Sequence, residues 1–385
     1  MSINFDQIVD RRGSDSEKWR RYGEDVLPLW VADMDFASPE PIVRALRERA
    51  EHGVFGYGAK PPELRAVLVE RLSRLYDWQV SAEDLVFVPG VVTGFNLACR
   101  AAASPGAGVL VQTPVYPPFL TAPGNAGLEL QSMQLTPESS GRYAVDFAAF
   151  EHAISERTQA FILCNPHNPV GRAFRRDELE HMAEICMRHE IVICSDEIHC
   201  DLLFSGARHV PIASIDPQVA ERTITLMAPS KTFNIAGLQC SVAIIQNAEL
   251  RRRFKRARAG LVPEVNVMGF VAALSAYRDG QAWLDELLAY LDGNLDFLTG
   301  YVRAYLPGIA LSRPEATTLA WLDCRQAAIP RNPHQFFLHQ AKVALNDGAT
   351  FGPGGDGFVR LNFGCPRSTL AEALDRMRAA MVALG

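Results

Sequence analysis

The sequence predicts an α/β protein with a mainly parallel, doubly wound sheet and a second, smaller α+β domain. From residue 85 onward, short apolar runs alternate with helical segments, which is the pattern of strands joined by crossover helices. Most of these runs are apolar at every position, as expected of strands that are covered on both faces. With 385 residues, 48% of them hydrophobic, the chain can bury a large core and divide into two domains.

The first part of the chain is expected to be an irregular arm followed by two helices. Residues 1–37 end in the segment 29–36, which places two acids and a methionine among apolar residues without helical period. The run Ser-Pro-Glu-Pro that begins at Ser38 predicts a helix start with a serine cap, and Gly53 should end this helix. Apolar residues at helical spacing over 64–75 predict a second helix.

The remaining elements set the predicted domain boundaries. The apolar runs that predict the strands of the large sheet are 85–88, 109–112, 160–164, 191–194, 223–226 and 242–245. From about residue 280 a long helix to about Tyr305, short strands and a closing helix from about Ser368 predict the smaller domain. We therefore expect residues 1–45 to form an arm and part of the small domain, 46–279 the large domain, and 280–385 the small C-terminal domain.

Composition narrows the class of protein. A net charge of -6 and a pI near 5.9 argue against nucleic acid or an anionic membrane as the main partner. The basic run 251–258 is interpreted as a solvated or interface helix face. No secretory signal and no apolar stretch of about 20 residues is evident, and the eight cysteines form no Cys-x-x-Cys pair. We expect a cytoplasmic protein with reduced core cysteines.

Residues that directly follow the predicted strands are the first candidates for a site, because ligands of doubly wound sheets bind beyond the carboxyl ends of the strands. The run 223–227 leads into Ala-Pro-Ser-Lys, which places Lys231 next to a buried strand. A partly buried lysine has a lowered pKa, and its neutral amine can react with a carbonyl carbon. The alternative is a strand-end lysine that reaches water.

Three further strand ends have characteristic sequences. After 85–88, the run Pro-Gly-Val-Val-Thr-Gly predicts a turn that opens a helix, whose free N–H groups suit a phosphate. After 109–112 comes Tyr116, which is a candidate site residue or a packing aromatic. After 160–164, two Asn-Pro pairs within 165–171 predict a rigid extended turn.

An acid and an arginine complete the candidates. Asp196 follows the run 191–194, where a buried carboxylate needs a partner or becomes protonated. Arg360 interrupts an apolar strand, and its planar guanidinium suits a carboxylate or phosphate, with an internal ion pair as the alternative. A metal site is the competing hypothesis for the region after Asp196. Its possible ligands fit no zinc spacing, so we predict no metal; they are His199, Cys200, Asp201 and His209.

The order of these motifs resembles the fold-type I enzymes of pyridoxal 5′-phosphate, the aspartate aminotransferase superfamily. The resemblance covers nearly the whole chain and implies a mainly parallel mixed sheet flanked by helices. The motifs are Gly-Tyr-Gly (56–58), Pro-Gly-Val-Val-Thr-Gly (89–94), Asn-Pro-His-Asn-Pro-Val-Gly (165–171), Ser-Asp-Glu-Ile-His (195–199), Ser-Lys-Thr-Phe-Asn (230–234) and Val-Arg-Leu-Asn-Phe-Gly (359–364). Within the superfamily, residues 30–36, 195–201 and 360–367 are similar to the cystathionine β-lyase, or carbon–sulfur lyase, branch.

The resemblance implies a role for each matching residue. Lys231 is implied as the lysine that binds the cofactor covalently, Asp196 as the partner of its pyridine nitrogen, and Tyr116 as the residue stacked on its ring. Asn168 and His199 are implied near the ring hydroxyl. Arg360, together with Asn168, is implied in substrate binding, with the guanidinium on the α-carboxylate.

Phosphate binding is where the sequence departs from many relatives. The resemblance implies that the phosphate is held by the backbone of Val91 and Val92 and by the Ser230 hydroxyl. It also implies that Tyr57 of the neighbouring subunit reaches this phosphate. Many relatives have an arginine eight residues after the lysine and a serine three residues before it. Those two positions are Gln239 and Ala228 here.

The implied function is a homodimeric carbon–sulfur β-lyase with shared active sites. It would convert cystathionine or cysteine S-conjugates to pyruvate, ammonia and a thiol, with Lys231 removing the Cα proton. An aminotransferase of class I/II would use the same residues. A regulatory protein that keeps the fold and binds a transcription factor is a third hypothesis, but a pure binder does not need the lysine, aspartate and arginine together. The sequence leaves the thiol leaving group open.

Overall fold

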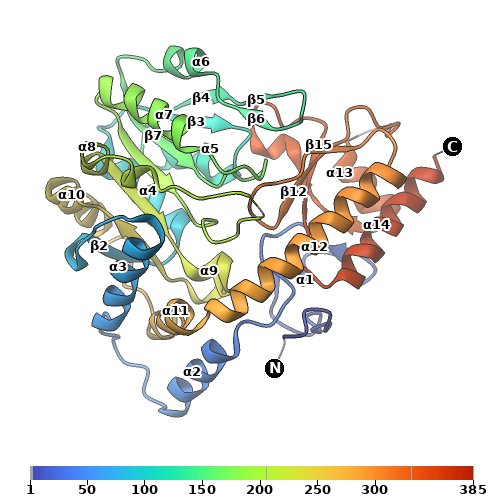
Figure 1. Ribbon diagram of the computed structural model, residues 1–385, viewed down its shortest axis with the longest axis horizontal. Helices are drawn as coiled ribbons and strands as arrows, with labels where there is room; N and C mark the ends of the chain where they lie inside the picture. The colour runs from blue at the N-terminus through green and yellow to red at the C-terminus, as the bar shows by residue number, and fades with distance from the viewer. Residues whose placement is uncertain (1–2, 205, 331, 385) are drawn as a thin grey trace.

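The six predicted strands lie in one mixed sheet of the computed structural model, which describes residues 3–204, 206–330 and 332–384 (Figure 1). Their ends differ from the predicted ends by at most two residues. Neighbouring strands are parallel except at β10, which is antiparallel to both of its neighbours. In spatial order the strands are β2 (Leu85–Val88), β10 (Ser241–Ile244), β9 (Thr223–Met227), β8 (Val192–Asp196), β7 (Thr158–Cys164), β3 (Gly108–Thr113) and β4 (Glu129–Gln134).

Helices cover both faces of this sheet, which explains why the strand sequences lack alternation. Val86 and Val88 of β2 pack in one cluster with α4 (Val91–Ala102), α5 (Pro117–Asn125) and α10 (Ala248–Arg258). Leu85 and Phe87 of the same strand face the other way, toward α3 (Pro62–Tyr76) and α11 (Val267–Asp279). Farther along that second face, α7 (Arg176–Arg188) packs on β7 and β8. The prediction of a doubly wound sheet is confirmed.

Helix α2 (Glu40–Glu51) begins where the sequence predicts, but the predicted serine cap is wrong. Pro39 occupies the N-cap position and no side chain caps the helix. The Ser38 hydroxyl instead donates to the carbonyl oxygen of Asn234 at 3.0 Å, which ties the entry of α2 to the segment after Lys231. Gly53, with φ +74°, follows the helix in the left-handed region.

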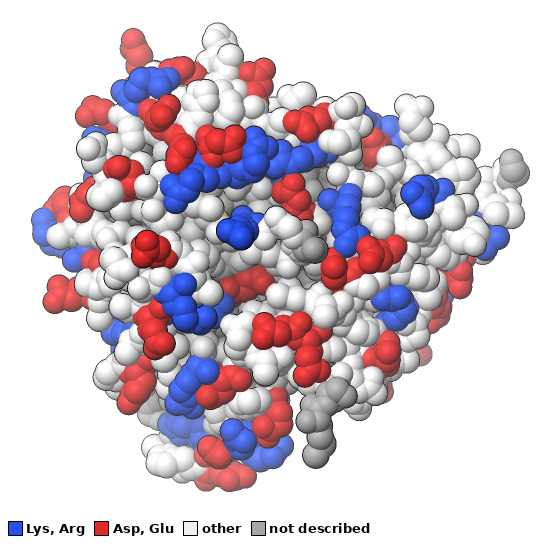
Figure 2. Space-filling view, in the orientation of Figure 1, with Lys and Arg blue, Asp and Glu red and all other residues white. Residues whose placement is uncertain are grey.

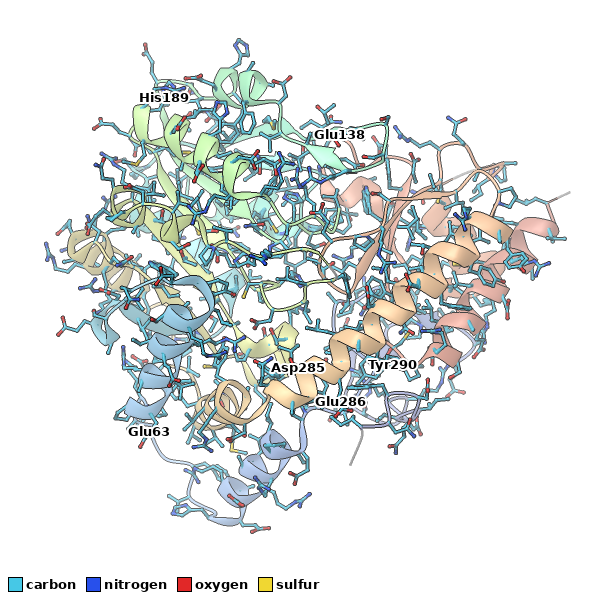
Figure 3. The ribbon with its side chains drawn as sticks, viewed as in Figure 1. Glu63, Glu138, His189, Asp285, Glu286 and Tyr290 are labelled. Carbon is cyan, nitrogen blue, oxygen red and sulfur yellow. The ribbon has the colours of Figure 1, made fainter. Side chains whose placement is uncertain are left out.

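The C-terminal part forms a second, antiparallel sheet in the order β11 (Ala310–Leu311), β12 (Leu319–Asp323), β15 (Phe358–Asn362) and β14 (Asn346–Asp347). The long predicted helix is α12 (Gln281–Tyr305), and the closing one is α14 (Arg367–Val382). Both pack in one core with the N-terminal arm. The hydroxyl of Tyr290 on α12 (Figure 3) donates to Asp6 at 2.6 Å and accepts from the Arg367 N–H at 2.7 Å.

The arm is also held by a short parallel pair, β1 (Leu27–Pro28) with β13 (Val343–Ala344). The domain boundaries at residues 45 and 279 stay a prediction. The cysteines are free and buried, as the sequence predicts. Among the helices that the structure describes, none is long and apolar enough to cross a membrane. Basic and acidic side chains are interspersed over the face shown in Figure 2.

Candidate active site

A pocket of about 360 Å³ opens at the carboxyl ends of the parallel strands, where the sequence predicts the site. It is bounded by the segments that follow β2, β3, β7, β8 and β9, by β15 of the second sheet, and by residues 30–32 of the arm. Every predicted site residue except Tyr57 lines it. These are Val91, Val92, Tyr116, Asn168, Asp196, His199, Ser230, Lys231 and Arg360.

Lys231 lies on the short helix α9 (Pro229–Thr232), directly after β9. Its Nζ donates to the carbonyl oxygen of Ala32 at 2.9 Å. Burial lowers the pKa of Lys231 to about 8, although the Asp33 carboxylate opposes this. The next residue, Thr232, donates to the Asp201 carboxylate at 2.9 Å, which anchors the turn that presents the lysine. The amine therefore faces the pocket with a reduced affinity for its proton.

Asp196, the last residue of β8, faces the pocket with 5% of its surface exposed. Burial raises the pKa of its carboxyl group to about 7, against the Ile198 N–H that donates to it at 3.1 Å. Behind it, Glu197 accepts from the Ser195 hydroxyl at 2.8 Å and pairs with His209 at 2.7 Å. Asp196 has no cationic partner of its own among the described residues, so a ligand with a positive N–H group would stabilise it.

Arg360, in β15, is surrounded by neutral acceptors. Its guanidinium donates to Asn168 Oδ1 at 2.8 Å, to the Trp30 carbonyl oxygen at 3.0 Å and to Asn346 Oδ1 at 2.5 Å. Its Nε is buried and has no acceptor among the described residues, and burial lowers the pKa of the guanidinium to about 10. In the part of the chain that the structure describes, no carboxylate pairs with Arg360, so the alternative of an internal ion pair is not observed.

The remaining pocket residues are polar groups with unused hydrogen-bonding capacity. Burial lowers the pKa of His199 to about 3, with Lys231 and Arg360 adding to the effect, so its imidazole is neutral. Its Nδ1 has no partner among the described residues. Because Asn168 accepts from Arg360 through Oδ1, its NH₂ group remains to donate. The Tyr116 N–H bonds to the Asn168 carbonyl oxygen at 3.1 Å and brings the aromatic ring to the same pocket.

The start of α4 also lines the pocket. Gly90 occupies the N-cap with φ +107°, and the first N–H groups of a helix have no partner within the helix. Val91 and Val92 present these groups, with Ser230 and Gln239 in the same pocket lining. A phosphate fits such a helix start.

The comparisons with known proteins agree with this geometry. Residues 24–377 match the model of the family "Aminotransferase class I and II".

The chain belongs to this family. It is 40% identical to cystathionine beta-lyase PatB of Bacillus subtilis, over 98% of this chain and all of that one. Its fold is similar to the crystal structure of OvoB, with TM-score 0.95, 46% identity and coverage of 99% and 100% of the two chains. It is also similar to the structure of cystalysin from Treponema denticola with a pyridoxal 5′-phosphate cofactor, with TM-score 0.96, 32% identity and full coverage of both chains.

Two features of the site in this member of the family were not predicted from the sequence. Asn346 lies opposite Arg360 in the β14–β15 pair, and the Ala32 carbonyl oxygen accepts from Lys231. A lone asparagine and a backbone carbonyl group give no sequence signal. A correct prediction of the pairing register of β14 and β15 would have placed Asn346 opposite Arg360.

Tyr57 lies outside the pocket, and of the possible metal ligands only His199 is in the pocket lining. Tyr57 is fully exposed in the loop between α2 and α3, so its role in a partner's site stays a prediction. Asp201 pairs with Arg71 at 2.5 Å, and His209 pairs with Glu197. Within the described ranges, no group of three or more histidine, cysteine or acidic residues could hold a metal ion.

Proposed function

We propose that this chain is a pyridoxal-phosphate-dependent carbon–sulfur β-lyase that acts on cystathionine or cysteine S-conjugates. The observation that supports this most is a set of three charged groups in one pocket, none of which has an ion-pair partner among the described residues: Lys231, Asp196 and Arg360. Relatives that align over nearly the whole chain are named cystathionine beta-lyase, and a PLP-bound C-S lyase from Staphylococcus hominis has the same fold.

The residues present fit the cofactor. When bound, pyridoxal phosphate supplies an electron sink that stabilises negative charge at the substrate Cα. Asp196, whose pKa is raised to about 7 by burial, would gain a cationic partner in the pyridine nitrogen. Val91 and Val92, with the Ser230 hydroxyl, would hold the phosphate.

The ring would lie between side chains that the pocket already brings together. Tyr116 would stack on it, and Asn168 and His199 would lie near the ring hydroxyl. The Lys231 amine would provide the covalent attachment.

The chain's own residues would bind the amino acid and move its proton. Arg360 would accept the α-carboxylate in its planar fork, which limits rotation about Cα. The amino group of the substrate would first replace Lys231 in the covalent attachment. The freed Lys231 amine, whose pKa burial lowers to about 8, would then be partly neutral near neutral pH and remove the Cα proton. The thiolate then leaves Cβ. With one water consumed, the products are pyruvate, ammonia and the thiol.

We also infer a homodimer with shared active sites, in the cytoplasm. Three large apolar side chains are exposed in the loop between α2 and α3. The exposed fractions of Val54 and Phe55 are 62% and 60%, and Tyr57 is fully exposed. An exposed apolar patch of this kind suits a protein interface. Mixing inactive Lys231→Ala subunits with impaired Tyr57→Phe subunits should restore activity, since one composite site in each hybrid is intact. Confirmed subunit exchange without recovery would contradict the shared site.

Buried free thiols suit a reducing compartment.

An assay without a keto-acid acceptor separates the lyase from an aminotransferase. Cystathionine or an S-alkyl cysteine should yield pyruvate, ammonia and free thiol in equal amounts through many cycles. If product forms only when a 2-oxo acid is supplied, with transfer of the amino group to it, the chain is an aminotransferase instead.

A further inference from the structure

The segment Trp30–Asp35, here called the strap, links the two cationic groups of the pocket. It forms no helix or strand. The Trp30 carbonyl oxygen accepts from Arg360 at 3.0 Å, and the Ala32 carbonyl oxygen accepts from Lys231 Nζ at 2.9 Å. The side-chain amide of Asn362 also donates to the strap, to the carbonyl oxygens of Val31 and Asp33 at 2.7 and 2.8 Å. A shift of the strap backbone would therefore move the acceptors of both Arg360 and Lys231.

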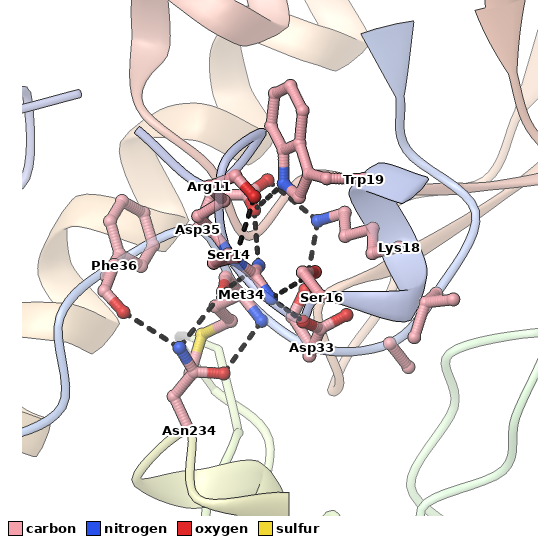
Figure 4. A network of polar contacts seen from close by, with 12 residues as sticks. Arg11, Ser14, Ser16, Lys18, Trp19, Asp33, Met34, Asp35, Phe36 and Asn234 are labelled. Carbon is pink, nitrogen blue, oxygen red and sulfur yellow. Dashed lines mark hydrogen bonds and ion pairs between the residues drawn. The ribbon is translucent and has the colours of Figure 1, made fainter. Parts of the chain in front are cut away.

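A partly buried ion cluster anchors the strap (Figure 4). We call it the arm cluster, and it consists of Arg11, Lys18, Trp19, Asp33 and Asp35. The Asp35 carboxylate accepts from Lys18 at 2.7 Å, from Arg11 at 2.6 Å and from the Trp19 indole N–H at 2.9 Å. Asp33 pairs with Arg11 at 2.6 Å. Two cations thus match two carboxylates, in a place where the Lys18 and Asp35 side chains are only 1% and 5% exposed.

The arm cluster also holds the strap backbone directly. Lys18 Nζ donates to the Asp33 carbonyl oxygen at 3.1 Å, and Arg11 donates to the Met34 carbonyl oxygen at 3.1 Å. From the other side, the Asn234 amide accepts from the Met34 N–H and donates to the Met34 carbonyl oxygen, both at 2.9 Å. Asn234 lies three residues after Lys231, so the strap is fastened to the segment that bears the lysine.

We propose that the arm cluster is a positioning device for the reaction: it fixes the strap, and the strap carbonyl groups set the Lys231 amine and the Arg360 guanidinium relative to each other. The proposal rests on the proposed function. A neutral amine that donates an N–H to the Ala32 oxygen points its lone pair away from that oxygen, so the strap orients the base. Arg360 fixes the carboxylate of the same substrate, and a misplacement of about 1 Å between reacting groups can cost on the order of 100-fold in rate.

The test compares Asp35→Asn with Asp25→Asn in the full-length holoenzyme. Asp25 is the matched control, because it lies in the same arm but pairs with Lys342 at 3.2 Å on the exposed surface. We expect Asp35→Asn to lower kcat for an S-alkyl cysteine by about 10- to 100-fold and Asp25→Asn to leave it unchanged. Cofactor absorbance should be retained in both variants, since the proposed phosphate and ring contacts lie outside the arm cluster.

A second readout does not depend on turnover. In the cofactor-free protein, hydrogen exchange of the strap amides should accelerate in Asp35→Asn and stay unchanged in Asp25→Asn. Faster exchange together with wild-type kcat and KM would make the arm cluster merely structural and would overturn the proposal. Rescue adds a further check, because Lys18→Arg keeps the charge and should retain more activity than Lys18→Met.

A milder variant covers the case in which Asp35→Asn does not fold. Trp19→Phe removes the indole N–H that donates to Asp35 and keeps an aromatic side chain. It should lower kcat several-fold, and an unchanged kcat in folded Trp19→Phe contradicts the proposal. If the wild type turns over no β-substituted amino acid, the proposed function fails. The exchange measurement still reports whether the arm cluster fixes the strap.

Discussion

Arg71 and Arg360 are both buried, yet their partners differ in kind. Arg71 on α3 pairs with the Asp201 carboxylate at 2.5 Å, whereas Arg360 donates to neutral oxygens. Burial alone would lower the pKa of both. Asp201 outweighs it and raises the pKa of Arg71, while the pKa of Arg360 falls to about 10. Arg71 therefore completes an internal pair, and Arg360 keeps a charge that a ligand can neutralise.

The same contrast separates two lysines. Lys18 is paired with Asp35 at 2.7 Å, whereas the Ala32 carbonyl oxygen is the only acceptor of Lys231 among the residues that the structure describes. Within the described part of the chain, buried charged groups with an ion-pair partner belong to the scaffold, and those without a partner lie in the pocket. Groups with shifted pKa values in a cleft are candidates for a functional role. Lys18 and Arg71 show that the same residue types are paired with carboxylates where they serve the scaffold.

The largest expected effect comes from removing the unmatched lysine. Lys231→Ala should lower turnover on the order of 100- to 10,000-fold, because the general base is lost, while the protein stays folded. The half-exposed Lys342 supplies the control Lys342→Ala, which should keep wild-type turnover. Steady-state kinetics on folded protein checks this. A folded Lys231→Ala enzyme within tenfold of the wild type would contradict the assignment.

Removing each arginine should separate stability from binding. Arg71→Met leaves the Asp201 carboxylate buried without its partner and should cost about 3–5 kcal/mol of unfolding free energy. Arg360→Met leaves neutral oxygens behind, so it should cost less stability and instead raise KM for the amino acid. Chemical denaturation and steady-state kinetics measure the two effects. Equal destabilisation by both variants would break the comparison.

Asp196→Asn tests the unmatched acid. It should fold and bind cofactor but lose on the order of 100-fold or more in turnover. The folded pKa of about 7 lies above the ordinary value of 3.8, so ionising Asp196 costs stability progressively between these pH values and fully above them. The cofactor-free variant should therefore melt higher than the wild type at pH 8, but not at pH 3. Near-normal turnover would mean that another acid has this role.

The smallest expected effect comes from giving Arg360 a partner of its own. Asn346 accepts from Arg360 at 2.5 Å, so Asn346→Asp would make this arginine resemble Arg71. An internal carboxylate competes with that of the substrate, and we expect KM to rise about tenfold, the equivalent of about 1.4 kcal/mol. Asn346→Ala removes the contact without adding charge and is the matched control. An unchanged KM in the aspartate variant would place the substrate carboxylate elsewhere.

The sequence predicted the elements that have a strong periodic or apolar signal. The six buried strands and the helices α2, α3, α12 and α14 lie where they were expected. The edge strand β4 was missed because its sequence, Glu-Leu-Gln-Ser-Met-Gln, is mostly polar and partly exposed. The Ser38 cap was wrong because the hydroxyl bonds to Asn234, far along the chain, and local rules cannot anticipate such a partner.

The pocket was predicted as far as side-chain type and strand end specify it. Lys231, Asp196 and Arg360 each stand out beside an apolar run, and strand topology brings them together. The acceptors of Lys231 and Arg360 do not stand out in the sequence. Ala32 contributes only its backbone carbonyl group to Lys231, and the position of Asn346 beside Arg360 follows from the register of two strands. The acids at 33 and 35 pair with Arg11 and Lys18, and no local sequence pattern specifies these contacts.

The proton affinity of Lys231 in the cofactor-free protein tests the central contrast most directly. The rate at which an acylating reagent modifies Lys231 can be followed against pH by peptide mass spectrometry. A desolvated lysine without an ion pair to any described carboxylate should titrate with a midpoint near 8. A midpoint at or above the ordinary lysine value of 10.5 would show that the charge is compensated and would contradict the account.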